Sequence, residues 1–445
     1  MFRFAVLSMA LIPLLAAAES LSIVSPKDGA VVPTLSEGQK AFFKMPRKER
    51  IAYFEKKDCR KKMVALGWYP KATALVWKGG APGASYSVVL KRAEDGKVVF
   101  SSTTNNTSVV VDNLEIATAY EWTVSGGGEL SARFTTEDAT PRLMRIPGVP
   151  NFRDIGGRIG LGGRRVRQGM VYRSTGLNDN ATVKYMNRKE LEKAGKITPK
   201  MLAKEKKIKA HIEHYRRYQA NPLFFQRDHR GWQEWSKRHP TATVADYFKR
   251  RINGDEAELK RVFQVEKSRQ SGKSRLTDAT RAYLTETLGI KSEIDLRSSR
   301  ECHGMTGSPM GSKVKWFHYS SHAYGGMQSD KGKAAFKKVF EVFLDERNYP
   351  IDFHCISGQD RTGSVAFILN GLLGVAEEEL YHDWEATGFW NRSTSLCHSQ
   401  RFNHLVEGFN KKVSGNGIHE KIENYVLGLG FTKKDIEKFR SIMLK

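Results

Sequence analysis

Alternating apolar and polar positions dominate the first third of the chain. Short runs rich in Val, Tyr, Trp and Thr are separated by Gly, Pro and Asn, which predicts β-strands at residues 72–77, 86–90, 107–111 and 119–124. Because evenly spaced short strands are typical of two packed sheets, we expect an all-β sandwich over residues 19–140. Residues 36–66 interrupt this pattern with Lys- and Arg-rich sequence that favours helix, which predicts a basic helical insertion.

The pattern changes after about residue 277, where short apolar runs alternate with helical periodicity. The runs at residues 293–296, 315–319 and 351–354 are predicted to be strands. Apolar residues at positions 336, 339, 340, 343 and 344 follow the spacing of an amphipathic helix, and residues 361–373 predict a second, mainly apolar helix. Strands that alternate with helices predict an α/β domain with a mainly parallel central sheet flanked by helices.

Three prolines, Pro141, Pro147 and Pro150, mark a linker, so the second domain is expected to cover residues 141–445. Within it, the stretch at about residues 181–276 contains 25 Lys and Arg against 11 Asp and Glu. This charge density predicts a basic insertion of exposed helices or a surface that binds a polyanion. We interpret its interleaved aromatic residues as the buried side of amphipathic helices, with base stacking on nucleic acid as the alternative.

The whole chain of 445 residues is basic, with 73 Lys and Arg against 48 Asp and Glu and a formal net charge of +25. Such an excess favours a polyanionic partner, for which a phosphorylated substrate, nucleic acid, an acidic surface and a cell-wall polymer all remain open. Exposed basic helices with no such partner are the simpler alternative.

The first 18 residues have the pattern of a secretory signal peptide. Arg3 gives a positive start, residues 4–15 are apolar, and residues 16–18 are alanines that offer a cleavage site. The apolar run is too short to span a bilayer, and no other uncharged run approaches about 18 residues, so no membrane span is expected. We therefore expect an exported protein, either periplasmic or secreted.

Four cysteines follow the predicted signal peptide: Cys59, Cys302, Cys355 and Cys397. Their even number permits disulfides in an oxidising compartment, but their wide spacings match no metal-binding pattern. We expect a disulfide-poor protein in which one cysteine is chemically active. Cys302 is interpreted as an unrelated thiol, with a resolving partner for an oxidised Cys355 as the alternative.

The segment from His354 to Gly363, with the sequence HCISGQDRTG, carries the candidate chemistry. It lies between a predicted strand and a predicted helix, so its backbone N–H groups and the positive end of the helix can surround a tetrahedral dianion. A thiol at the base of this nest, Cys355, should have a pKa below its ordinary value and act as a nucleophile. Arg361 can bind two phosphate oxygens with its planar fork.

This arrangement predicts hydrolysis of phosphate monoesters without a metal or another cofactor. Cys355 attacks phosphorus, and water then hydrolyses the phosphocysteine. Asp360 is the nearest carboxylic acid that could protonate the leaving group, with a role as a helix cap as the alternative. The other residues expected to form the phosphate-binding loop are His354, Ile356, Ser357, Gly358, Gln359, Thr362 and Gly363.

Some loop residues have more specific expected roles. Gly358 lets the backbone approach the ligand, and Gly363 lets the helix begin close to it. Thr362 is expected to donate a hydrogen bond to the departing thiolate, and His354 is expected to orient the loop through hydrogen bonds.

The loop resembles the Cys-x5-Arg loop of the protein tyrosine phosphatase superfamily. It is most similar to the branch of bacterial secreted tyrosine and phosphoinositide phosphatases, whose loop reads His-Cys-x-x-Gly-x-Asp-Arg-Thr-Gly. Three more segments resemble that branch: NFRDIGG at 151–157, VYRST at 171–175 and IDLRSSRE at 294–301. The resemblance covers about residues 141–178 and 277–445, and it implies phosphocysteine chemistry.

In that branch the Asp beside the Arg is thought to act as the general acid, so the resemblance assigns this role to Asp360. The alternative acids lie around His318, His322 and Asp330. Many members of the branch carry a Lys associated with phosphoinositide activity at the position where this chain has Gln359.

Charged residues in the other segments are expected either to support the site or to form structural ion pairs. They are Asp154, Arg173, Asp295 and Arg297. In the N-terminal domain, the order of aliphatic and aromatic positions resembles a fibronectin type III module over about a hundred residues. These positions are Leu75, Trp77, Tyr86, Leu114, Tyr120 and Trp122.

We therefore predict an exported cysteine-dependent phosphatase of the phosphotyrosine or dual-specificity type. A phosphatase for inositol polyphosphates or phosphoinositides is the alternative within the same class. A polyanion-binding adhesion protein with weak or no catalysis is the alternative from another class, and the intact pair of Cys355 and Arg361 argues against it.

Overall fold

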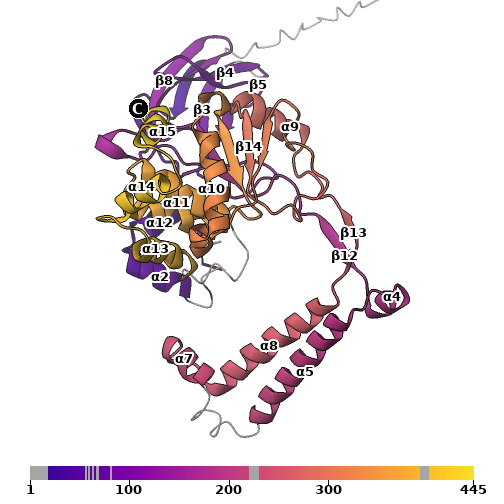
Figure 1. Cartoon of the computed structure of the whole chain (residues 1–445). Helices are drawn as coiled ribbons and strands as arrows, with labels where there is room; N and C mark the ends of the chain where they lie inside the picture. The colour runs from indigo at the N-terminus through magenta and orange to yellow at the C-terminus, as the bar shows by residue number, and fades with distance from the viewer. Residues whose placement is uncertain are drawn as a thin grey trace, which may run out of the picture. The chain divides into compact units, whose positions relative to one another are not determined.

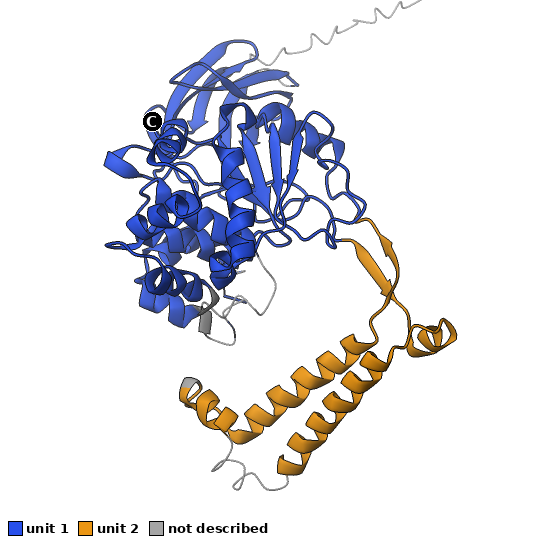
Figure 2. Ribbon diagram, in the orientation of Figure 1, with its two compact units in different colours: residues 1–180, 273–445 blue, residues 181–272 orange. Residues whose placement is uncertain are grey.

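The computed structural model describes residues 19–445 except 56–57, 59–60, 63–64, 67–69, 81–82, 220–229 and 391–399. The chain divides into two compact units, which Figures 1 and 2 show. Unit 1 comprises residues 1–180 and 273–445, and unit 2 comprises residues 181–272.

The N-terminal part of unit 1 contains two β-sheets that share one core. Their strand orders are β1 (Glu19–Ser25), β3 (Thr73–Gly80), β6 (Ser108–Val111), and β2 (Ala30–Val32), β8 (Glu129–Thr136), β7 (Ala119–Ser125), β4 (Tyr86–Arg92), β5 (Val98–Thr104). Buried residues alternate with exposed or half-buried residues along β4 and β7, because successive side chains of a strand point to opposite faces. Trp77 from the first sheet and Trp122 from the second meet in the core, with ring centroids 6.4 Å apart.

The four strands predicted in this region correspond to β3, β4, β6 and β7. The prediction missed β1, β2, β5 and β8. The sequence of β5, VVFSSTT, ends in polar residues and lies at the edge of its sheet, so it has no fully buried face. Short or polar edge strands leave little periodicity in the sequence.

Two helices, α1 (Glu37–Lys44) and α2 (Arg47–Glu55), lie in the segment that was predicted to favour helix. Phe42 and Phe43 form the buried side of α1. Both rings pack against Phe389 of the C-terminal region at 5.5 Å between centroids. The two helices therefore help to join the β-rich region to the rest of unit 1.

The C-terminal part of unit 1 is built on a six-stranded sheet. Its strand order is β15 (Lys315–His318), β14 (Ser292–Asp295), β16 (Ile351–His354), β11 (Val171–Ser174), β10 (Arg153–Asp154), β9 (Arg142–Leu143). The strands from β15 to β11 are parallel, whereas β10 and β9 are antiparallel, so the predicted mainly parallel sheet is present. Asp295, His354 and Ser174 lie in register at the carboxyl ends of β14, β16 and β11.

Helices complete this part of unit 1, and Figure 1 shows α10 and α11 alongside the sheet. They are α9 (Asp278–Ala282), α10 (Asp330–Phe343), α11 (Asp360–Leu372), α12 (Glu377–Glu385), α13 (Gln400–Lys412), α14 (Ile418–Leu427) and α15 (Lys433–Met443). The largest core contains Phe353 of β16, Phe340 of α10 and Ile368 of α11. A second core, with Met144, Tyr172 and Leu284, lies outside that cluster.

Unit 2 consists of a two-stranded antiparallel sheet and helices. Its elements are β12 (Thr182–Tyr185), α4 (Arg188–Lys193), α5 (Pro199–Gln219), α7 (Arg230–Arg238), α8 (Val244–Val262) and β13 (Glu266–Gln270). The sides of the helices that face one another bury Ile212, Tyr215, Trp232, Tyr247 and Phe248. These aromatic residues therefore form the buried side of amphipathic helices, as the sequence pattern predicted.

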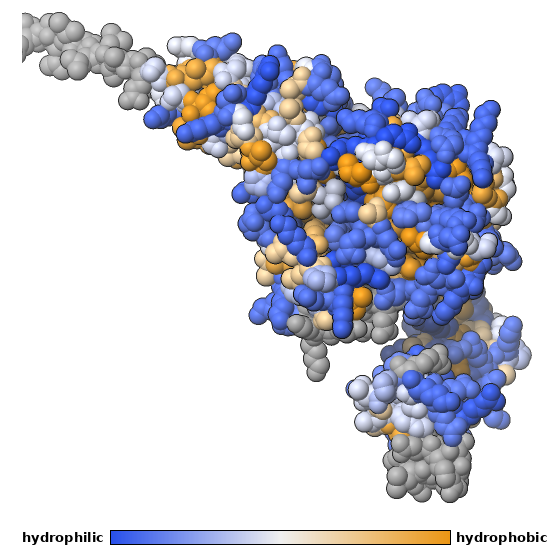
Figure 3. Space-filling view, turned by 90° about the vertical axis from the view of Figure 1, so that its left-hand side faces the viewer, coloured by the Kyte–Doolittle hydropathy of each residue, from blue (hydrophilic) through white to orange (hydrophobic). Residues whose placement is uncertain are grey.

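Hydrophilic residues cover most of the face shown in Figure 3, and apolar residues form small separate patches on it. Within the described residues, no helix is both long enough and apolar enough to cross a membrane.

Candidate active site

The segment from β16 to α11 forms a strand–loop–helix turn. His354 ends β16, Cys355 follows it, and α11 begins at Asp360. Gly358 has a φ of 66°, and a Cβ atom there would lie 2.3 Å from the carbonyl oxygen of Ser174. A side chain cannot fit that space, so glycine is what allows the loop to turn against the end of β11.

Three successive carbonyl groups of the loop, at residues 356–358, are held from outside. In order along the loop they accept hydrogen bonds from the N–H of Gly176 (3.0 Å), the side-chain amide of Asn151 (2.8 Å) and the guanidinium of Arg173. The N–H groups of the same three residues donate no hydrogen bond to the described part of the chain. Because the three carbonyl groups are bound on one side of the loop, the three N–H groups remain as unused donors that suit an anion.

A single buried carboxylate organises three arginines behind the loop. Asp383 of α12 accepts a hydrogen bond from Arg173, and its Oδ1 lies 3.3 Å from Nε of Arg153 and from Nη2 of Arg158. Burial acts to raise the pKa of Asp383, but the three guanidinium groups outweigh it and lower the pKa to about 2. Asp383 is therefore ionised at neutral pH, and it fixes the arginine that holds the loop.

Cys355 lies at the base of the loop and is buried. Burial acts to raise the pKa of its thiol, but the charge of Arg361 and the hydroxyl and N–H of Thr362 outweigh it and lower the pKa. The Thr362 hydroxyl is buried and meets no other acceptor in the described chain, so it is available to the sulfur. The lowered pKa favours the thiolate, which is the nucleophilic form.

Arg361 lies in the first turn of α11, and Glu301 positions its guanidinium. Nη1 donates to Oε2 of Glu301 at 2.8 Å, and Nη2 donates to Oε1 at 3.3 Å. Nε makes no hydrogen bond with a described residue, so it remains for a phosphate oxygen. Glu301 was quoted within the motif at 294–301 but was not predicted as a site residue.

Asp360 is the first residue of α11, and Tyr324 holds its carboxylate. The Tyr324 hydroxyl donates to Oδ1 of Asp360, and the Tyr324 backbone N–H donates to the Ser364 hydroxyl at 2.9 Å. Tyr324 has a φ of 52°, which is rare for a bulky residue and requires support from its surroundings. These contacts fix one oxygen of Asp360 and leave Oδ2 for a proton.

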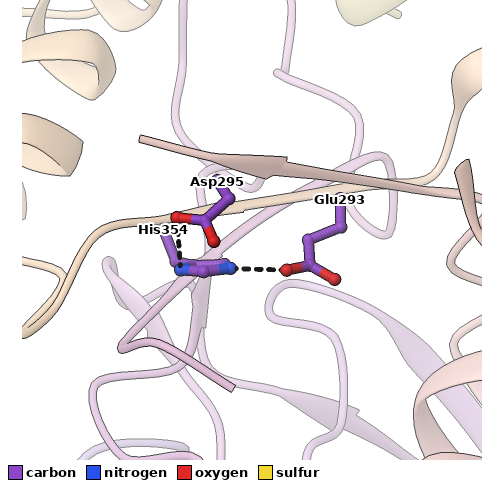
Figure 4. Close-up of side chains that lie close together, drawn as sticks. All are labelled: Glu293, Asp295 and His354. Carbon is purple, nitrogen blue, oxygen red and sulfur yellow. Dashed lines mark hydrogen bonds and ion pairs between the residues drawn. The ribbon is translucent and has the colours of Figure 1, made fainter. Parts of the chain in front are cut away.

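His354 is buried between two carboxylates, as Figure 4 shows. Its Nε2 lies 2.8 Å from Oε1 of Glu293, and its Nδ1 lies 3.9 Å from Oδ1 of Asp295. Burial acts to lower the pKa of His354, but the two carboxylates outweigh it and raise the pKa to about 9. His354 is therefore an imidazolium next to Cys355 in the chain, which agrees with an orienting role rather than a role as an acid or base.

The same cluster offers three atoms within 4.8 Å of one another that could hold a metal ion. However, Arg297 donates to Asp295 at 2.6 Å, so two cations already balance the two carboxylates. A metal would need a neutral His354, which the raised pKa opposes. The residues therefore fit an internal ion cluster better than a metal centre.

The supporting residues predicted from the sequence have different positions. Arg173 contacts the loop directly, whereas Asp295 and Arg297 form a buried pair with each other beneath it. Asp154 instead pairs with Arg142 at 2.7 Å and accepts hydrogen bonds from the backbone of residues 156 and 169, so it stabilises the sheet edge. Of the two alternatives for Asp154, the structure favours the structural ion pair.

Cys302 donates a hydrogen bond to Asp295 at 3.2 Å. Burial and the Asp295 carboxylate raise the pKa of the Cys302 thiol, which makes it a poor resolving nucleophile. Cys59 and Cys397 lie outside the described residues.

His318 is one of the alternative general acids predicted from the sequence. Its Nε2 lies 2.8 Å from the backbone carbonyl oxygen of Arg297, within hydrogen-bond distance.

Two comparisons with known proteins identify relatives of this chain. The model of the Tyrosine phosphatase family matches residues 144–198 and 255–445, which is more than half of the chain. A tyrosine-protein phosphatase from Nostoc commune is 26% identical over 151 residues, covering 29% of this chain and 51% of the relative. The chain thus spans about half the length of that curated relative. The extent of the family match shows that this chain belongs to the tyrosine phosphatase family.

Proposed function

We propose that this protein hydrolyses phosphate monoesters, of the phosphotyrosine or dual-specificity type, through a phosphocysteine intermediate. The observation that carries the proposal is the loop at residues 356–358, whose carbonyls are bound from outside while its N–H groups remain unused. Cys355, with its lowered pKa, lies at the base of that loop. The loop would bind the dianion and aim it at the thiolate.

The steps follow from the positions of the side chains. The Cys355 thiolate attacks phosphorus, the bond to the leaving oxygen breaks, and that oxygen takes a proton from Asp360. Arg361, positioned by Glu301, binds the equatorial oxygens on which charge collects. Water then attacks the phosphocysteine, Asp360 accepts its proton, and Thr362 donates a hydrogen bond to the departing thiolate.

Cys355→Ser provides the test of this proposal. The serine variant should lose turnover of para-nitrophenyl phosphate while it keeps vanadate binding, because the loop and Arg361 bind the anion and only the thiolate forms the covalent bond. Calorimetric titration with vanadate and a turnover assay measure the two properties. More than a few per cent of residual turnover in the variant would refute the mechanism, whereas faster turnover of inositol phosphates than of phosphopeptides by the wild type would favour the alternative substrate class.

We also propose that unit 2 binds a polyanion. It contains 23 Lys and Arg against 11 Asp and Glu. A cavity of about 960 Å³ on it is lined by four basic residues, Lys200, Lys204, Lys207 and Arg251, and by two acidic ones, Asp255 and Glu258, of which Glu258 pairs with Lys204. Retention on immobilised heparin should therefore fall steeply with salt and should fall further when the three lysines are replaced by glutamine. Unchanged retention in the triple variant would refute this proposal.

Export and the fibronectin type III likeness remain proposals that rest on the sequence pattern of residues 1–18 and of the β-rich region. Expression in a bacterium that has a secretory system, followed by mass measurement of the mature N-terminus, tests export. A mature chain that still begins at Met1 would contradict cleavage after residue 18.

A further inference from the structure

A cavity of about 460 Å³ opens beside the phosphate-binding loop. Ile356 and Ser357 of the loop form one part of its lining, and the segment around Pro150 forms another. Because these two loop residues immediately follow Cys355, any group in the cavity would lie next to a phosphate bound in the loop. The mechanism proposed above uses no side chain of this cavity other than the loop itself.

Most of the lining is apolar. Ile146, Pro150, Ile356 and Trp390 contribute hydrocarbon surface, and all but Ile146 are partly exposed. Partly exposed apolar walls around a concave space favour an apolar ligand group, because its binding removes both surfaces from water.

Arg275 is the charged residue of this lining, and the fold positions it firmly. Its Nε donates to Asp179 at 2.8 Å and its Nη1 to the carbonyl of Gly176 at 3.3 Å, while its backbone N–H donates to the carbonyl of Leu177 at 3.0 Å. Nη2 makes no hydrogen bond within the described residues. The guanidinium is thus held at one edge and keeps donors for an anion at the other.

The backbone also fixes Arg275 beside the cavity. Gly148 has a φ of 77°, and a Cβ atom at that position would lie 2.4 Å from the Arg275 carbonyl oxygen. This close approach is possible only for glycine, so the turn that carries Ile146 and Gly148 packs directly on the backbone of Arg275. The apolar wall and the cation are therefore parts of one built site.

We propose that this cavity is a second substrate subsite, which receives the residues that flank the phosphorylated residue of a peptide. An apolar side chain of the peptide packs against Ile146, Ile356 and Trp390, and an acidic side chain binds Arg275. This inference rests on the proposed phosphatase function and adds a preference for phosphopeptides with an acidic neighbour.

The test compares matched phosphopeptides on the full-length protein. The two peptides of a pair differ at one residue, which is Glu in one peptide and Gln in the other. In one pair this residue precedes the phosphotyrosine and in the other it follows it, and kcat/KM is measured for each peptide. The wild type should prefer the Glu peptide of at least one pair by about tenfold, which is the size of one charge-assisted hydrogen bond. Arg275→Gln should remove the preference for Glu. The control is Lys273→Gln, which removes one positive charge two residues away and outside the lining, and this variant should keep the preference.

Each outcome decides the proposal. Equal turnover of every Glu and Gln pair by the wild type would overturn it, and so would an Arg275→Gln variant that keeps the preference. If Arg275→Gln does not fold, Trp390→Ala serves as the second variant, and it should weaken a preference for Leu over Ser at the flanking position by about fivefold. Absence of wild-type turnover of para-nitrophenyl phosphate would instead count against the phosphatase function itself.

Discussion

The two units use their charges in opposite ways. In unit 1 the arginines at 50, 153, 158, 173 and 297 are fully buried, and each is paired with a carboxylate. In unit 2 each ion pair between described residues has at least one exposed partner, and in Lys204 with Glu258 both side chains are exposed, at 52% and 47%. A buried pair constrains geometry because breaking it leaves an uncompensated charge, whereas an exposed pair contributes little. The buried pairs of unit 1 thus constrain its geometry, whereas the exposed charges of unit 2 suit the proposed polyanion partner.

The largest expected effect comes from Asp383→Asn, which removes the carboxylate shared by three buried arginines. We expect a loss of about 3–5 kcal/mol in the free energy of unfolding and loss of most phosphatase activity, because Arg173 no longer has a fixed position against Gly358. Urea unfolding followed by circular dichroism measures the free energy of unfolding, and kcat measures the phosphatase activity. Asp138→Asn is the matched control, because Asp138 pairs with Arg165 at the surface and should contribute no more than about 1 kcal/mol.

Asp360 lies between the two extremes, since it is half-buried and its proposed role is chemical. Asp360→Asn should reduce hydrolysis of phosphotyrosyl peptides by about 10²–10⁴-fold and reduce hydrolysis of para-nitrophenyl phosphate much less, because a good leaving group needs no proton. A series of aryl phosphates of increasing leaving-group pKa checks this. Equal losses across the series would assign Asp360 a structural role.

Tyr324→Phe sharpens the same experiment. It keeps the ring and removes the hydroxyl that donates to Asp360. The variant should therefore show the same dependence on the leaving group as Asp360→Asn, but with a smaller loss of activity. A uniform loss of activity would show that Tyr324 only supports the backbone.

The His354 cluster predicts how stability depends on pH. The pKa of His354 is raised to about 9 in the folded chain from about 6.5 in the unfolded chain. The stability that His354 contributes is therefore complete below about pH 6.5 and is lost as the pH rises through about 9. The expected decrease is on the order of 3 kcal/mol. Unfolding should be measured in Cys355→Ser protein, because the lowered pKa of the thiol gives a slope of the opposite sign.

The control for this pH dependence is His354→Gln combined with Cys355→Ser. In this variant the free energy of unfolding should depend less steeply on pH between pH 7 and 9. Data below pH 7 are set aside because the buried Asp352, whose pKa burial raises to about 7, titrates there. A curve that keeps its slope without His354 would show that another group titrates.

The smallest expected effect is that of Glu258→Gln in unit 2. Removing this exposed partner of Lys204 should change the free energy of unfolding by no more than about 0.5 kcal/mol. A loss of more than about 2 kcal/mol in chemical denaturation would contradict the contrast between the two units.

Local sequence predicted the parts of the site that are contiguous in the chain. The strand predicted at 351–354 is β16, and the helix predicted at 361–373 is α11 with a one-residue difference at each end. A strand, a Gly-containing loop and a helix N-terminus within about ten residues form a pattern that short-range physics determines. The mainly parallel sheet followed from the same alternation of strands and helices.

The sequence did not reveal the residues that position the loop from a distance. Asp383 lies 210 residues from Arg173, and Tyr324 lies 36 residues from Asp360. No spacing rule connects such positions, because tertiary packing alone brings them together. Asn151 and Glu301 lay within quoted motifs, but nothing in their neighbours distinguished a contact with the loop from a local hydrogen bond or ion pair.

The two segments of unit 1 that flank unit 2 in the chain lie side by side. The N–H of Asp179 donates to the carbonyl of Lys273 at 2.8 Å, and Asn178 forms a β-bridge with Ser274. Strand β11 must pair with β16, and the partners Val171 and Ile351 are about 180 residues apart in the chain. Residues 181–272 make up roughly half of that separation.

This arrangement has a consequence for the kinetics of folding. The entropy lost on closing a loop increases with the logarithm of its length, so each doubling costs about 0.6 kcal/mol. Once unit 2 has folded through its own hairpin contacts, its ends meet and the loop that β11 and β16 must close is about half as long. We therefore expect refolding of the parallel sheet to proceed at nearly the same rate when a short Gly/Ser linker replaces residues 181–272, as stopped-flow fluorescence can measure. A large insertion can thus be carried in the middle of a slow-forming sheet without delaying its assembly.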